Sequence, residues 1–176
     1  TISVTIDVPA NTTVRYTLDG SIPTIDNGKL YMPGCEDLTD FASTRVVRAR
    51  AFQAGQQPSE TVTVSYIMNK YHEMDVVSLV CEPHELWDQE TGLLSDAPDP
   101  RYYKETEELV VDKSELPFET PVYRNWGKID RPGYVEIFHY DTGEAYIAQG
   151  IKMDLMGDYS LDMPQKSFKI RAQAAY

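Results

Sequence analysis

Residues 131–157, RPGYVEIFHYDTGEAYIAQGIKMDLMG, contain the pattern that decides the fold of this chain. Apolar and polar side chains alternate with a period of two residues over 135–138 and again over 145–153, which is typical of half-buried strands. The turn sequence Asp141–Glu144 lies between these runs, so the stretch predicts a β-hairpin. A third alternating run, 166–172, predicts a further strand after it.

Short runs of the same kind precede the hairpin and are separated by turns rich in Gly and Pro. They occupy residues 2–8, 14–18, 45–52, 62–66 and 76–80. Because no apolar period of a long helix appears, we expect a mostly β protein. Together with a short apolar piece at 30–31, these runs give five or six strands before residue 68, which predict an Ig-like β-sandwich over 1–68. A linker over 69–75 and a second β-rich module with little helix over 76–176 follow.

The second module contains a long acidic insertion. Between Glu82 and Pro117 there are eleven acidic residues and three basic ones. This composition predicts a solvated excursion with a single helical turn in 82–92 and one strand, 109–111. A calcium site is the less favoured interpretation, because the regular D-x-[DN]-x-[DN]-G ligand spacing is missing.

Composition excludes several classes of function. The chain has 176 residues, of which 41% are hydrophobic, and a net charge of −12. Such a charge argues against binding to nucleic acid or to an anionic membrane surface. No apolar window reaches the length of a membrane span. Because Thr1 is not a Met, we expect the chain to be an excerpt of something longer, and we expect Cys35 and Cys81 to be two buried or half-buried thiols.

The first module resembles a known family. The segments VRYTLDGSIPT (14–24) and VRARAF (47–52), followed by Gly55, Pro58 and Tyr66, are similar to the β-sandwich at the C-terminus of chitobiase and hexosaminidase enzymes. In that family the module accompanies a catalytic domain and carries no catalytic residues. The resemblance therefore implies a spacer or binding role.

The second module resembles the N-terminal part of the CotH family, bacterial spore-coat and cell-surface proteins that are similar to atypical protein kinases. The matching segments are 76–80, 85–87, 90–92, 130–138, 141–143, 150–152, Ser160 and 164–170. The family's G-x-S-R pattern is replaced here by Asp158-Tyr159-Ser160-Leu161, which lacks the Arg. The resemblance places the family's catalytic and metal-binding acids beyond Tyr176, so it implies no ATP and no divalent metal for this chain alone.

Few residues suggest chemistry. Lys166 shares a strand face with Phe168 and Ile170, so its ammonium must be paired, reach water or meet a phosphate. It is the candidate nucleotide-phosphate contact of a complete kinase-like protein, against the alternative of a snorkelling or salt-bridged lysine. Neither a catalytic residue nor a metal ligand is predicted, since His72, His84 and His139 lack ligand spacing.

Aromatic residues offer a second kind of candidate site. The candidates for a platform that stacks on sugar rings are Trp87, Tyr102, Tyr103, Tyr123 and Trp126. Packing in the core is the competing interpretation of the same residues.

The sequence thus predicts a non-catalytic part of a secreted or cell-surface bacterial CotH-like protein that acts as a scaffold, adhesion or spacer module. One alternative is the N-terminal lobe of an atypical kinase, inactive without a C-terminal part, and another is a carbohydrate-binding module. The expected partners are that C-terminal domain and a cell-surface protein or polysaccharide. We expect no nucleic acid and no membrane span among the interactions.

Overall fold

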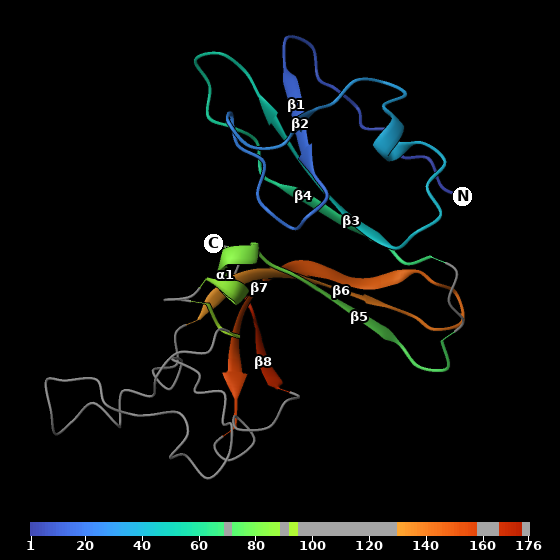
Figure 1. The fold of residues 1–176 in the computed structure, drawn as a ribbon, viewed down its shortest axis with the longest axis vertical. Helices are drawn as coiled ribbons and strands as arrows, with labels where there is room; N and C mark the ends of the chain where they lie inside the picture. The colour runs from blue at the N-terminus through green and yellow to red at the C-terminus, as the bar shows by residue number, and fades with distance from the viewer. Residues whose placement is uncertain (69–71, 89–91, 95–129, 158–165, 174–176) are drawn as a thin grey trace, which may run out of the picture. The chain divides into compact units, whose positions relative to one another are not determined.

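The computed structural model describes residues 1–68, 72–88, 92–94, 130–157 and 166–173 (Figure 1). These residues form two antiparallel four-stranded sheets. The prediction of a mostly β fold is confirmed, and the two sheets are consistent with a β-sandwich-like fold.

The chain divides into two compact units. One contains Thr1–Val80 and Tyr134–Gln149, and the other contains Cys81–Gly133 and Gly150–Tyr176. The domain boundaries expected from the sequence, 1–68, 69–75 and 76–176, stay a prediction.

The first sheet has the strand order β2-β1-β3-β4. Its elements are β1 (Thr13–Thr17), β2 (Lys29–Leu30), a 3-10 helix η1 (Glu36–Leu38), β3 (Arg45–Phe52) and β4 (Val62–Tyr66). β1 and β3 pair in register from Thr13 opposite Phe52 to Thr17 opposite Arg48. The alternating runs at 14–18, 45–52 and 62–66 are therefore confirmed as strands.

The prediction of a strand over residues 2–8 is wrong. This segment makes one isolated β-bridge, at residue 2, and single backbone contacts beyond it. Val4 donates its N–H to the carbonyl of Leu38 at 2.8 Å, and Ile6 donates its N–H to the Tyr31 hydroxyl at 3.0 Å. The partners are a 3-10 helix and a side chain, so no ladder forms. The alternation has a different cause, because Val4 and Ile6 pack against the core.

One face of the first sheet carries the hydrophobic core. Its buried members are Val14, Tyr16, Tyr31, Leu38, Val47 and Ala49. Tyr16 is only 2% exposed, its ring meets the Tyr31 ring edge to face at 6.5 Å, and its hydroxyl donates to Asp37 at 3.1 Å. This cluster holds β1, β3 and the loop before η1 together.

The opposite face of the same sheet is buried as well, and it is polar. In β4, Thr63 and Ser65 are both 4% exposed, whereas Val62 is 61% exposed. Arg48 in β3 is 8% exposed. The alternation along β4 therefore marks the two faces correctly, but the polar face is the more buried one because it is covered by further polar contacts described below.

Gly28 occupies a position that a larger residue would disturb. Its φ is +97°, and an added Cβ would lie 2.9 Å from the carbonyl oxygen of Tyr16. We expect Gly28→Ala to lower the free energy of unfolding by roughly 2–4 kcal/mol, from the left-handed backbone and the contact together. Gly55→Ala is the matched control, since φ is +75° there and nothing lies within 4 Å. Urea unfolding should show a loss of about 1–2 kcal/mol for the control, and equal losses would contradict the steric explanation.

The second sheet has the strand order β5-β6-β7-β8. Its elements are β5 (Val76–Val80), β6 (Arg131–Phe138), β7 (Ala145–Met156) and β8 (Ser167–Ala172). β6 and β7 flank the turn at 141–144, so the predicted hairpin is confirmed, as is the strand at the third run. β5 pairs with β6 from Val76 opposite Phe138 to Val80 opposite Tyr134.

The helical turn expected near residue 82 is confirmed as the short helix α1 (Pro83–Trp87). Cys35 and Cys81 are half-buried thiols that form no disulfide. No helix within the described ranges is long and apolar enough to cross a membrane. Most of the acidic insertion, including the strand expected at 109–111, lies outside the described residues.

Candidate functional site

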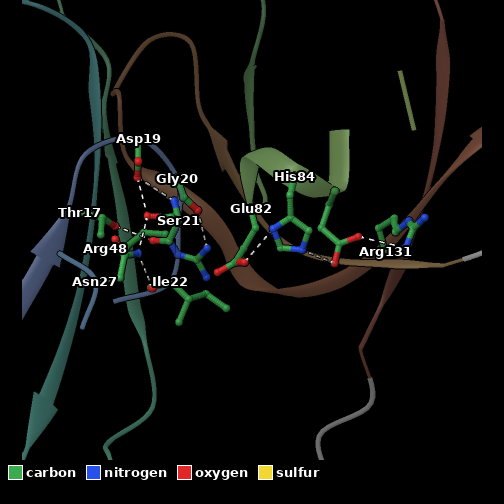
Figure 2. Close-up of polar contacts among 11 residues, drawn as sticks. Thr17, Asp19, Gly20, Ser21, Ile22, Asn27, Arg48, Glu82, His84 and Arg131 are labelled. Carbon is green, nitrogen blue, oxygen red and sulfur yellow. Dashed lines mark hydrogen bonds and ion pairs between the residues drawn. The ribbon is translucent and has the colours of Figure 1, made fainter. Parts of the chain in front are cut away.

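Arg48 lies at the centre of the buried polar face of the first sheet (Figure 2). Its Nη1 donates to the carbonyl oxygen of Gly20 at 2.7 Å, and its Nε donates to the Thr63 hydroxyl at 3.2 Å. One guanidinium thus connects β3, β4 and the turn after β1. Buried charged side chains of this kind are stable only when they are hydrogen-bonded, and Gly20 and Thr63 supply two of these bonds.

The turn that Arg48 contacts is held by its own side chains (Figure 2). The Asp19 carboxylate accepts from the Ser21 backbone N–H at 3.0 Å and from the Ser21 hydroxyl at 2.7 Å. These two donors lower the pKa of Asp19. Asn27 donates to the Ser21 hydroxyl at 3.0 Å and to the Ile22 carbonyl at 3.1 Å. The polar residues of the sequence DGSIPTIDN therefore build a turn.

A second polar cluster surrounds α1 (Figure 2). The two nitrogens of His84 lie 3.1 Å from a Glu82 oxygen and 3.5 Å from a Glu85 oxygen. Arg131, at the start of β6, forms an ion pair with Glu85 at 3.2 Å, and both side chains are mostly buried. The ion pair between Glu85 and Arg131 connects the helix to the strand. Trp87, at the end of α1, is 64% exposed.

A third cluster lies at the β6–β7 turn. Asp75, just before β5, accepts from the backbone N–H of Tyr140 at 3.1 Å and from the Tyr146 hydroxyl at 2.8 Å. The bond from Tyr146, followed by the bond from Tyr140, lowers the pKa of Asp75, and the Tyr146 pKa is raised by the same bond. Each oxygen of this carboxylate therefore positions one side of the turn.

Three rings gather beside that carboxylate. The His139 ring stacks on the Tyr140 ring with centroids 5.4 Å apart and planes at 29°, and it meets the Tyr146 ring edge to face at 6.0 Å. The Nδ1 of His139 lies 2.6 Å from an Asp141 oxygen. Tyr140 and Tyr146 are 49% and 55% exposed. The turn thus presents fixed aromatic rings to solvent next to two carboxylates.

A buried carboxylate lies within strand β6 of the same hairpin. Glu136 in β6 is 4% exposed and stands opposite Ser78 in the ladder. The hydroxyls of Ser65 and Ser78 share a hydrogen bond of 2.8 Å. Burial raises the pKa of Glu136, and hydrogen bonds with Ser65 oppose that rise. Its Oε2 is buried and has no hydrogen-bond partner among the described residues.

The sequence-predicted site residues are not brought together in the described part of the chain. Lys166 is half-buried and immediately precedes β8, where Phe168 is half-buried and Ile170 is 40% exposed. Of the proposed sugar platform only Trp87 is described. Tyr102, Tyr103, Tyr123 and Trp126 lie outside the described residues.

The histidines and acids of the described residues do not form a metal site. Within the described ranges, no three His, Cys, Asp or Glu side chains form a group that could hold a metal ion. His84 and His139 instead contact carboxylates at the surface.

The ring cluster at the β6–β7 turn was missed by sequence reasoning. His139, Tyr140 and Tyr146 flank a turn, and aromatic residues there are not needed for the turn itself. The presence of three aromatic rings beside one turn was the sequence signal that could have pointed to this cluster. The sequence gives no sign of the role of Asp75, because it lies 65 positions from Tyr140.

Comparison with known proteins gives one informative match. Residues 1–63 match the family model of the chitobiase/beta-hexosaminidase C-terminal domain, so the resemblance seen in the first module is confirmed there. No curated protein and no solved structure matches the chain. Nothing in these comparisons supports the resemblance of 76–176 to the CotH family.

Proposed function

We propose that this chain is a non-catalytic, β-rich scaffold or spacer module of an extracellular or surface-attached protein. The match of residues 1–63 to an accessory domain of chitobiase-type enzymes supports this role, because that domain is a non-catalytic β-sandwich. Chitobiases act on saccharides outside the cell, which favours the same location for this chain.

The proposal rests on one observation: the buried polar groups of the matched module bind its own strands and turns. Arg48 binds Gly20 and Thr63, and Asp19 binds Ser21. Functional sites usually present polar groups to a ligand, whereas these hold strands and turns to one another. A module built in this way is suited to keep a fixed shape between neighbouring domains.

The kinase-lobe alternative depends on Lys166. In that proposal, Lys166 would contact the phosphates of a nucleotide once a C-terminal lobe is present, and the chain would be part of a CotH-type protein. Its support is the segment pattern quoted above together with the half-buried position of Lys166 beside β8. The ammonium of a lysine is a common phosphate ligand, and it also serves as a solvated or salt-bridged surface cation.

One experiment separates the two proposals. The chain is purified together with whatever its gene encodes after Tyr176 and is heated with and without Mg·ATP. The melting temperature is recorded together with any release of phosphate and any hydrolysis of a chromogenic N-acetylglucosaminide. For a scaffold we expect no turnover and an unchanged melting temperature. A rise with Mg·ATP that disappears in Lys166→Ala but persists in Lys169→Ala, a control on the exposed part of β8, would favour the kinase lobe instead.

A further inference from the structure

We propose that the surface formed by His139, Tyr140 and Tyr146 with Asp75 and Asp141 binds a pyranose ring of a neutral polysaccharide. This ring surface goes beyond the scaffold role, because it is a recognition site on a module that otherwise only holds shape. It also differs from the aromatic platform expected from the sequence, since none of its rings belongs to that set.

The rings are already ordered before any ligand arrives. The Tyr140 backbone N–H and the Tyr146 hydroxyl bind the two oxygens of one carboxylate, Asp75, at 3.1 and 2.8 Å. His139 lies between the tyrosines, stacked on one and edge-on to the other. A side chain that is fixed in this way loses little conformational entropy on binding, so exposed rings can contribute most of their contact energy.

The exposure of Tyr140 is assigned to one face of its ring. Tyr140 has one face against the imidazole of His139, with planes at 29°, yet the residue is still 49% exposed. Because the imidazole covers the first face, we assign this exposure to the second face. The axial C–H groups of a pyranose form a flat apolar surface of similar size, and the electron-rich face of a tyrosine ring attracts such polarised hydrogens.

The charges around the rings favour a neutral sugar. The side chains of Asp75 and Asp141 are 37% and 55% exposed, so their oxygens can accept hydrogen bonds from sugar hydroxyls. The same carboxylates, in a chain with a net charge of −12, repel uronic acids and sulfated or phosphorylated glycans. The surface therefore suits a hydroxyl-rich polymer without negative charge.

Affinity electrophoresis of the full chain tests this proposal. The gels contain hydroxyethylcellulose, glycol chitin or polygalacturonate, and each retardation is converted to a dissociation constant. We expect retardation by one or both of the neutral polymers, which identifies the sugar, and none by polygalacturonate. A wild-type chain that is not retarded by either neutral polymer, or is retarded equally by the anionic one, would overturn the proposal.

Three variants locate the site. Tyr140→Ala removes the ring but keeps the backbone N–H that binds Asp75, and we expect it to weaken binding about tenfold. Tyr140→Phe keeps the ring and should bind within about twofold of the wild type. Trp87→Ala removes an exposed aromatic on α1 and should leave binding unchanged. Unchanged binding in Tyr140→Ala, or loss of binding in Trp87→Ala, would place the site elsewhere.

A measurement on the wild type does not depend on the folding of any variant. Titration with cellohexaose or chitohexaose, followed by NMR, should shift the backbone amide signal and the ring signals of Tyr140. If the Tyr140 signals do not move at saturation and chemical shifts change only in other parts of the chain, the sugar does not bind at the ring surface and the proposal is contradicted.

Discussion

Tyr16→Ala is expected to lower the free energy of unfolding by about 3–5 kcal/mol, the range found when large buried aromatic side chains are removed. Tyr16 is 2% exposed and lies in the centre of the first core, where strands β1 and β3 meet. Its ring contacts the Tyr31 ring. Its hydroxyl donates to Asp37, which also pairs with Lys29 at 2.5 Å. Removal would leave a cavity and would take one of its two donors from Asp37, which keeps Lys29.

Urea unfolding followed by tyrosine fluorescence and circular dichroism measures this effect. Tyr16→Phe separates its two parts, because it keeps the ring and removes only the hydroxyl, and it should cost about 1 kcal/mol. Ile25→Ala is the control for loss of apolar surface at an exposed position, since Ile25 is 59% exposed, and it should fall within about 0.5 kcal/mol of the wild type. A loss below about 1 kcal/mol for Tyr16→Ala would show that the first sheet does not depend on this core.

Glu136→Gln is expected to stabilise the chain by about 1–3 kcal/mol at pH values above the raised pKa of Glu136, because an amide has no charge to desolvate. Burial raises the pKa of Glu136 in the folded state. Between the unfolded and folded pKa values the folded state therefore holds more protons, and the contribution of Glu136 to stability falls as pH rises through that interval. Gln reproduces the protonated acid in shape and keeps the contact with the hydroxyl of Ser65.

The groups that face Glu136 define the control. Ser78 is its ladder partner, and Glu136 in turn raises the pKa of Tyr66 and Tyr134, although burial is the larger cause for both tyrosines. The difference in unfolding free energy between wild type and Glu136→Gln should grow from acidic to neutral pH. Glu144→Gln, an exposed acid in the hairpin turn, should show no such trend. A difference that is constant with pH would contradict a buried, titrating Glu136.

Strand positions were largely predictable from sequence, because a period of two residues is a local property of the chain. The run at 45–52 is β3, and the run at 135–138 lies in β6, which begins earlier, at Arg131. Burial was less predictable. Arg48 and Glu136 stand on faces that alternation marks as polar, yet both are more than nine-tenths buried. Alternation distinguishes the two faces of a strand, but it does not say whether the polar face meets water or another polar surface.

The candidate site was harder to predict than the fold for a related reason. Sequence reasoning selected Trp87 and four aromatic residues within 102–126 as a possible exposed platform. The ring surface instead needs Asp75 beside a turn that begins at His139, and that proximity follows from the pairing of β5 with β6. Contacts between distant positions are decided by tertiary structure, so a local pattern gives no direct sign of them.

The pairing of β5 with β6 also has an evolutionary consequence. Val80, the last residue of β5, and Tyr134 in β6 are ladder partners, so the interval that begins at Cys81 joins two adjacent strands. The entropy of closing such a loop rises slowly, by only about 0.6 kcal/mol for each doubling of its length. Lineages could therefore lengthen, shorten or exchange this interval while the strands on either side stay as they are. The junction between Val80 and Tyr134 is a ready place for the gene to acquire new sequence.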